Sequence, residues 1–216
     1  MSLISGSMDD DKSYQLPPKK HLYYTNGLVL FIGALLVLSS WNIGNKPWDI
    51  LGIITPRFDQ TVIWSTFILI ILYLADSYLS LRSLKDDSEE FQSMSHIVPV
   101  NWKEYRHFIF LAFAAGISEE IIYRGFLIPY LLHYLPSSDY AYWIAIVIPG
   151  LIFAVSHFYQ GVQNVAKIFA ISILFGIIFI QSGSLIIVMI IHVVIDLLSG
   201  ILGVIAFNRL QKQNES

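Results

Sequence analysis

Six long apolar stretches place the strongest limit on how this chain can fold, because each is close to the length that crosses a membrane. A transmembrane helix needs about 20 mainly apolar residues. The stretches run over residues 26–44, 61–81, 108–135, 141–157, 165–182 and 185–207. The sequence therefore predicts an all-α protein, a polytopic membrane helical bundle with about six transmembrane helices. The third stretch is long enough for a break near Gly116 or Pro129.

The composition favours lipid rather than water as the solvent. Hydrophobic residues make up 55% of the 216 residues and charged residues 13%, whereas soluble domains carry about 25% charged residues. The lack of cysteine excludes disulfides, thiolate nucleophiles and cysteine-ligated metals. A net charge of −3 gives no sign of nucleic-acid binding. Residues 1–25 are predicted to be a polar tail, residues 26–207 the transmembrane helical domain, and residues 208–216 a second polar tail.

Loop charges predict the orientation, because Lys and Arg are enriched in cytoplasmic loops. With the N-terminus inside, the outer segments hold only Lys46 and Arg57. The inner segments hold the other basic residues that lie near the helix ends, which are Lys12, Lys19, Lys20, Arg82, Lys85, Lys103, Arg106, Lys167, Arg209 and Lys212. We therefore expect an integral membrane protein with both termini in the cytoplasm.

Charged side chains inside membrane helices are costly, so each one needs a reason. Glu119, Glu120 and Arg124 stand between apolar segments of the third stretch. On a helix, Glu120 and Arg124 share a face, so the arginine can neutralise this glutamate. Glu119 points about 100° away and lacks that local partner, which suits a general base or acid. The alternative is a helix end with ordinary interfacial charges.

Two further polar clusters follow on later helices. Phe153 precedes His157 by four residues and could brace its imidazole. Taken alone, a histidine such as His157 at a helix end is more often a satisfied interfacial residue. His192 and Asp196 lie one helical turn apart within an apolar stretch, so they can hydrogen-bond. The alternative for this pair is a polar contact that ties helices together.

The three clusters in this order, Glu-Glu-x-x-x-Arg, Phe-x-x-x-His and His-x-x-x-Asp, resemble the CAAX-protease and bacteriocin-processing (CPBP, or Abi) family. The resemblance covers about residues 108–207, which we take as the family core. It implies an intramembrane glutamate endopeptidase in which Glu119 and His157 activate the attacking water. Glu120 and Arg124 would hold the site together, with Phe153 as support. His192 and the residue at Asp196 would stabilise the oxyanion.

Asp196 departs from the family's commonest residue at this position, which is Asn. Asn can donate a hydrogen bond to an oxyanion, whereas an ionised Asp cannot. Asp196 is therefore better placed to orient His192 and keep it cationic, with His192 as the donor. This chemistry argues against direct contact of Asp196 with the oxyanion.

Other chemistries match the sequence less well. Neither His157 nor His192 stands in a His-Glu-x-x-His zinc motif. No metal or other cofactor is expected, although Glu119, His157 and His192 are suitable ligand types for zinc, which is the alternative. A transporter or proton relay would also place carboxylates and histidines in the membrane, but no repeat in two halves is visible. The remaining alternative is a non-catalytic immunity protein of the same fold.

The resemblance leaves the substrate open. The expected substrate is a peptide or a membrane protein. The family includes members linked to prenylated CAAX proteins and others linked to peptide or bacteriocin processing and immunity. A small chain with six predicted helices resembles bacterial members, so a bacterial cell membrane is the expected location.

Overall fold

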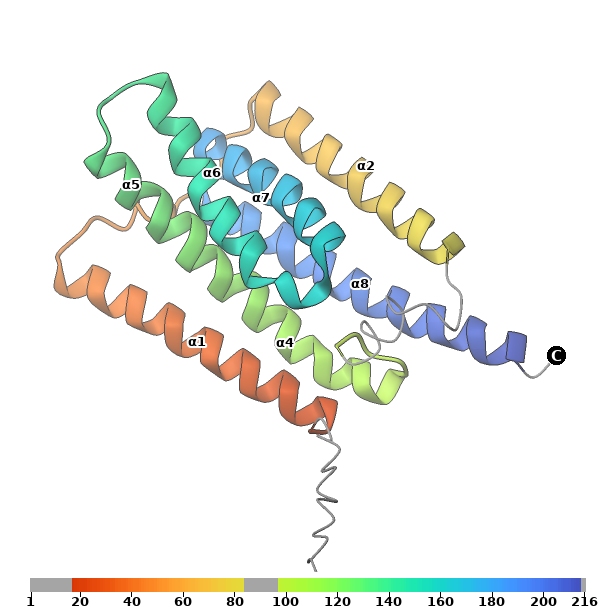
Figure 1. Ribbon diagram of the computed structural model, residues 1–216. Helices are drawn as coiled ribbons and strands as arrows, with labels where there is room; N and C mark the ends of the chain where they lie inside the picture. The colour runs from red at the N-terminus through yellow and green to blue at the C-terminus, as the bar shows by residue number, and fades with distance from the viewer. Residues whose placement is uncertain (1–16, 84–96, 215–216) are drawn as a thin grey trace, which may run out of the picture.

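The computed structural model describes residues 17–83 and 97–214 of the chain, and in these ranges every regular element is helical. Figure 1 shows long helices that run side by side as one bundle. The all-α membrane bundle predicted from the sequence is therefore confirmed. The elements in chain order are α1 (Lys19–Ile43), α2 (Gln60–Ser83), α4 (Trp102–Glu120), the π-helix η1 (Ile121–Leu127), α5 (Ile128–Tyr134), α6 (Asp139–Ser156), the 3₁₀ turn η2 (Phe158–Gln160), α7 (Val162–Ser182) and α8 (Leu185–Asn214).

Among the described residues, five helices are long and apolar enough to cross a membrane, namely α1, α2, α6, α7 and α8. The third predicted stretch differs because it carries charge at both ends of α4. Lys103, Glu104 and Arg106 lie in its first turns, and Glu119 and Glu120 lie in its last. The third predicted stretch, which contains Glu119 and Glu120, forms α4, η1 and α5 in succession.

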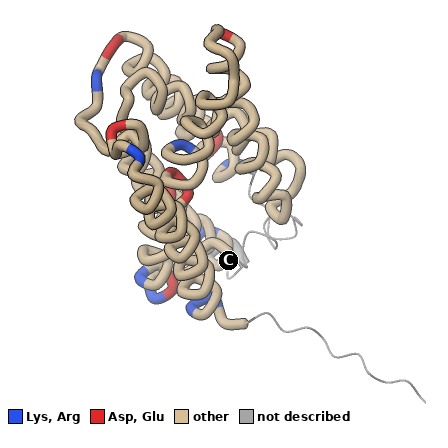
Figure 2. The backbone as a smooth tube through the Cα atoms, turned by 90° about the vertical axis from the view of Figure 1, so that its left-hand side faces the viewer, with Lys and Arg blue, Asp and Glu red and all other residues tan. Residues whose placement is uncertain are grey.

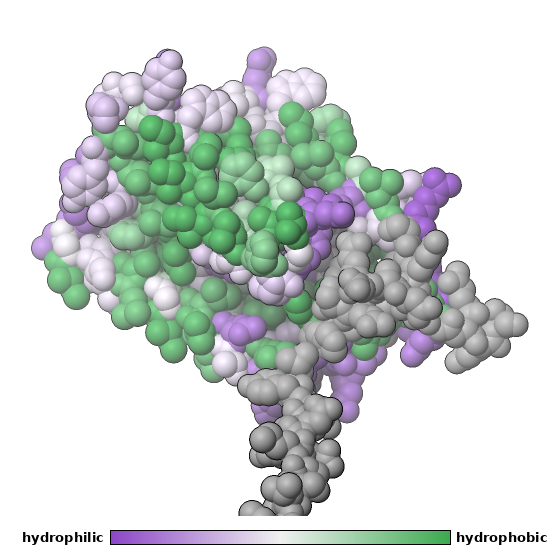
Figure 3. Space-filling model, in the orientation of Figure 1, coloured by the Kyte–Doolittle hydropathy of each residue, from purple (hydrophilic) through white to green (hydrophobic). Residues whose placement is uncertain are grey.

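The outer surface of the bundle is apolar, as a lipid environment requires. Large aliphatic side chains on α1 and α2 are exposed, including Leu36 at 64% and Ile63 at 56%. Figure 3 shows a broad hydrophobic surface over the helices, with hydrophilic residues toward the edges. In Figure 2 most charged residues lie toward the ends of the bundle. This surface would be unstable in water and is suited to the hydrocarbon core.

Contacts between segments far apart in sequence define the two ends of the bundle. At one end the Lys19 ammonium lies 2.7 Å from the Glu104 carboxylate, so α1 and α4 begin together. At the opposite end the Ser184 hydroxyl donates to the Ile54 carbonyl over 2.6 Å, which joins the α1–α2 loop to the turn before α8. These two contacts place predicted inner residues and predicted outer residues at opposite ends of the bundle. Lys12 and Lys85, which are also predicted to be inner, lie outside the described residues. Which end faces the cytoplasm remains a prediction.

Two helix boundaries differ from the predicted tails. Helix α1 begins at Lys19, inside the predicted N-terminal tail, and α8 continues to Asn214, through most of the predicted C-terminal tail. Of the two places suggested for a break in the third stretch, α4 continues through Gly116. The distortion lies near Pro129 as the π-helix η1, which ends two residues before this proline. We attribute it to the proline ring, which lacks an N–H and crowds the carbonyl one turn earlier.

Gly116 brings the acidic pair close to α8. A Cβ atom at this position would lie 2.6 Å from Val193 Cγ2 and 2.8 Å from the Val193 backbone nitrogen. Only glycine therefore permits this approach of the α4 and α8 backbones, as small residues do between membrane helices. Because Glu119 and Glu120 follow Gly116 by one turn and His192 precedes Val193, the close contact sets the distance between them.

Candidate active site

Glu120 and Arg124 form a fully buried ion pair at the junction of α4 and η1. The Arg124 NH1 group donates to Glu120 Oε1 over 2.8 Å, and the two side chains are 3% and 0% exposed. The faces of the guanidinium lie against two aromatic rings, with centroids 4.9 Å away for Phe153 and 5.2 Å for Phe175. The predicted pairing is thus present, and the rings keep water from it.

Glu120 also contacts a histidine from another helix, which sequence reasoning missed. His192 Nδ1 on α8 lies 2.7 Å from Glu120 Oε1, the same oxygen that accepts from Arg124. A carboxylate oxygen can only accept, so Nδ1 carries the hydrogen. Glu120 therefore fixes the orientation of the His192 ring and leaves Nε2 to face the rest of the site. The 72-residue separation hides this contact from helical spacing arguments.

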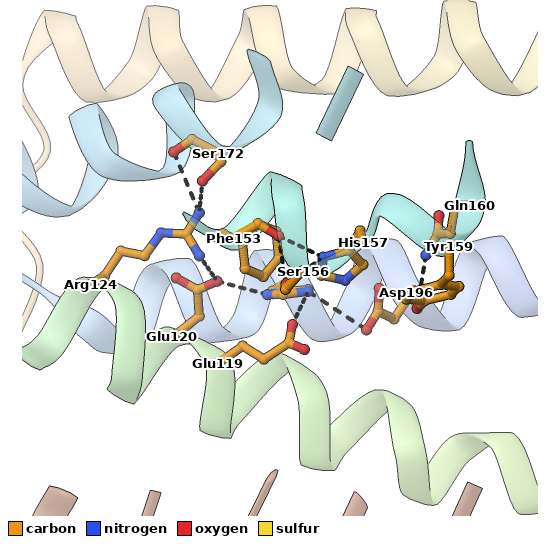
Figure 4. A network of polar contacts seen from close by, with 11 residues as sticks. Glu119, Glu120, Arg124, Phe153, Ser156, His157, Tyr159, Gln160, Ser172 and Asp196 are labelled. Atoms are coloured by element: carbon orange, nitrogen blue, oxygen red, sulfur yellow. Dashed lines mark hydrogen bonds and ion pairs between the residues drawn. The ribbon is translucent and has the colours of Figure 1, made fainter. Parts of the chain in front are cut away.

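Glu119 and Asp196 flank the other nitrogen of His192. Glu119 Oε2 and Asp196 Oδ2 each lie 3.7 Å from His192 Nε2. This distance exceeds that of a hydrogen bond, but each carboxylate forms an ion pair with His192 when the imidazole is protonated. The Glu119 side chain is 12% exposed and that of Asp196 is 27% exposed. The structure thus brings Glu119, His192 and Asp196 together, and Asp196 is the more accessible of the two carboxylates. Figure 4 shows Glu119 and Asp196 within one network of polar contacts.

Phe153 joins His157 to this cluster. The Phe153 ring centroid lies 4.7 Å from that of His157 and 6.2 Å from that of His192. His157 Nδ1 lies 2.8 Å from the Phe153 backbone carbonyl. A carbonyl accepts only, so Nδ1 donates, and in the neutral ring Nε2 is the nitrogen with the free lone pair. The predicted brace therefore uses both the ring and the main chain of Phe153.

Residues outside the three motifs complete the site. Ser172 on α7 accepts from Arg124 NH2 over 2.7 Å, and Phe175 packs against both Arg124 and His192. Figure 4 also shows Tyr159 of η2 beside Asp196. No sequence signal distinguishes these residues, since a serine, a phenylalanine and a tyrosine in apolar segments are ordinary.

The donor groups do not form a ready metal site. Within residues 17–83 and 97–214, no group of three or more His, Asp or Glu side chains is arranged to hold a metal ion. Both Nδ1 atoms of the two site histidines are already engaged by oxygens.

The comparison with known families agrees with the motifs. The model of the family described as type II CAAX prenyl endopeptidase Rce1-like matches residues 101–198. This segment includes all three polar clusters and overlaps the core expected at 108–207. No curated protein and no solved structure matches the chain. Residues 101–198 of the chain are therefore similar to the family of type II CAAX prenyl endopeptidases described as Rce1-like.

Proposed function

We propose that this protein is an intramembrane endopeptidase that hydrolyses a peptide bond with water activated by Glu119 and His157. The observation that carries the proposal is the convergence on His192 of Glu119, Glu120 and Asp196 from two helices, within a bundle whose outer surface is apolar. Ionisable groups inside membrane helices are energetically costly, so a set of this size indicates a functional site.

In this mechanism, Glu119 and His157 together act as the general base that activates the attacking water. Glu119 is the carboxylate that Arg124 does not neutralise, since the arginine pairs with Glu120. His157 donates from Nδ1 to a backbone carbonyl, so Nε2 can accept a proton from water. The activated water attacks the scissile carbonyl carbon, and the proton later passes to the leaving amine.

His192 stabilises the oxyanion that forms in this step. In its cationic form it donates from Nδ1 to Glu120 and from Nε2 to the oxyanion. Asp196, 3.7 Å from Nε2, orients the ring and balances its charge rather than contacting the oxyanion. Glu120 and Arg124 keep this arrangement fixed before the substrate arrives, which is how preorganised donors lower a barrier.

The substrate is a peptide segment or a membrane protein that reaches the site from the bilayer or from the cytoplasmic side. We further propose that both termini lie in the cytoplasm, because of the loop charges. The cell is proposed to be bacterial, because a small chain with six predicted helices resembles bacterial members of the family. Peptide or bacteriocin processing, or immunity, is the proposed context.

Reconstitution in proteoliposomes tests this function against a transporter. The endopeptidase account expects new peptide termini in an added peptide library and no uptake of solutes or protons. Solute or proton uptake without cleavage would replace the proposal with a transporter, and neither activity would favour a non-catalytic immunity protein.

The two replacements of Asp196 are expected to differ. Asp196→Asn keeps the shape and a hydrogen-bonding group near His192, so it should retain measurable activity. Asp196→Ala removes both and should lose most activity at every pH. The measurement is a pH–rate profile of kcat/KM for the three proteins on one peptide. Near-normal activity of Asp196→Ala would reduce Asp196 to a contact between helices.

Chelators are expected to leave peptidase activity unchanged, because water activated by a carboxylate and an imidazole needs no ion. The assay compares turnover before and after dialysis against a strong zinc chelator, with magnesium and zinc added back separately. Loss of activity that only zinc restores would favour the alternative, a zinc site formed by Glu119, His157 and His192.

A further inference from the structure

Ser172 stands outside all three motifs, yet it has the closest contact with the guanidinium of Arg124. The serine lies on α7 and is 2% exposed. Arg124 NH2 lies 2.7 Å from Ser172 Oγ and 3.4 Å from the Ser172 carbonyl oxygen. Ser172 therefore engages one arm of the guanidinium, while NH1 engages Glu120.

This division of the guanidinium is unusual for a buried Arg–Glu pair. Arginine commonly binds a carboxylate with two parallel hydrogen bonds, one to each oxygen. Here Glu120 Oε1 accepts from both Arg124 and His192, whereas the buried Oε2 has no hydrogen-bond partner among the described residues. An unpaired buried oxygen is costly, so a strong constraint must hold NH2 away from it.

We propose that Ser172 is a positioning residue that prevents Arg124 from closing on both oxygens of Glu120. With NH2 held on Ser172, the guanidinium offers only NH1, and Oε1 stays directed at His192 Nδ1. Without the hydroxyl, NH2 keeps only the longer contact of 3.4 Å to the Ser172 carbonyl, and it can turn to Oε2. The carboxylate then rotates toward Arg124, the bond to His192 weakens, and the His192 ring loses its fixed orientation. The effect on catalysis rests on the proposed function, whereas the effect on His192 does not.

Ser172→Ala is expected to lower kcat by roughly 10–100-fold, the range typical when a group that orients an active-site residue is removed. KM and thermal stability should change little, because the Arg124–Oε2 contact replaces the one that is lost. Ser172→Thr keeps the hydroxyl and should restore most of kcat. A matched control is Ser182→Ala on the same helix, which removes a buried hydroxyl that accepts from the Ser184 N–H and should leave kcat unchanged.

The decisive readout is the ¹⁵N NMR spectrum of histidine-labelled protein without substrate, with the His192 signal assigned through His192→Gln. We expect the Nδ1 signal of His192 to shift in Ser172→Ala and to stay in place in Ser172→Thr and Ser182→Ala. If the alanine variant does not fold, Ser172→Cys provides the same test, because a thiol has similar volume but is a weak acceptor.

An unchanged His192 signal in Ser172→Ala would overturn the proposal, and a loss of thermal stability with that signal in place would make Ser172 a packing residue. These outcomes are independent of peptidase activity. A wild-type protein that cleaves no peptide would refute the proposed function, while the shift of His192 would still test the role of Ser172.

Discussion

Glu119→Gln is expected to abolish peptide cleavage while the folded bundle remains intact. The amide keeps the size of the side chain but cannot accept a proton from water, and loss of a general base typically costs 10²–10⁴-fold in rate. The variant should elute and melt like the wild type, because Glu119 takes no part in the Glu120–Arg124 pair. Turnover of a quenched fluorescent peptide in detergent is the measurement.

A matched control for this prediction is Asp139→Asn, which alters an exposed carboxylate in the first turn of α6. It should keep wild-type turnover. Near-normal turnover of Glu119→Gln would show that another group activates the water, and His157 would then be the first residue to replace.

Arg124→Ala is expected to have the largest effect on stability. It leaves the carboxylate of Glu120, which is 0% exposed, without its guanidinium partner. Breaking a buried ion pair from one side typically costs about 3–5 kcal/mol. The variant should therefore show a lower melting temperature or poor yield, together with reduced activity, because the bond from Glu120 to His192 depends on the same oxygen.

The double variant Glu120→Gln with Arg124→Met provides the control for this interpretation. It removes both charges at similar volume and should be more stable than Arg124→Ala. Thermal unfolding in one detergent, followed by intrinsic tryptophan fluorescence, compares the three proteins. A fully stable but inactive Arg124→Ala protein would instead move Arg124 into the catalytic step.

Local patterns in the sequence predict much of the bundle and part of the site. The apolar runs locate the helices because the bilayer dictates both their length and their hydrogen bonding. The four-residue spacing of Glu120 and Arg124 predicts their ion pair, and it also leaves Glu119 outside that pair. These features depend on one helix at a time, so periodicity is enough to reveal them.

The features that the sequence does not reveal depend on how helices meet. The contact from His192 to Glu120 requires the close approach of α4 and α8 at Gly116. Pro129 indicates a distortion near this point, but its form as a π-helix at 121–127 also depends on packing against α1, α6 and α8, which no local pattern encodes. Ser172 has no neighbour in sequence that marks it as a partner of Arg124.

We expect this protein to hydrolyse peptide bonds and Glu119 to be indispensable for the reaction. The most direct measurement uses proteoliposomes that contain either the wild type or Glu119→Ala, incubated with a peptide library in H₂¹⁸O. The released peptides are then analysed by mass spectrometry. We predict that the wild type produces internal cleavages whose new carboxyl ends carry ¹⁸O. These cleavages should be absent with Glu119→Ala. The same labelled products from both proteins, or none from the wild type, would contradict this prediction.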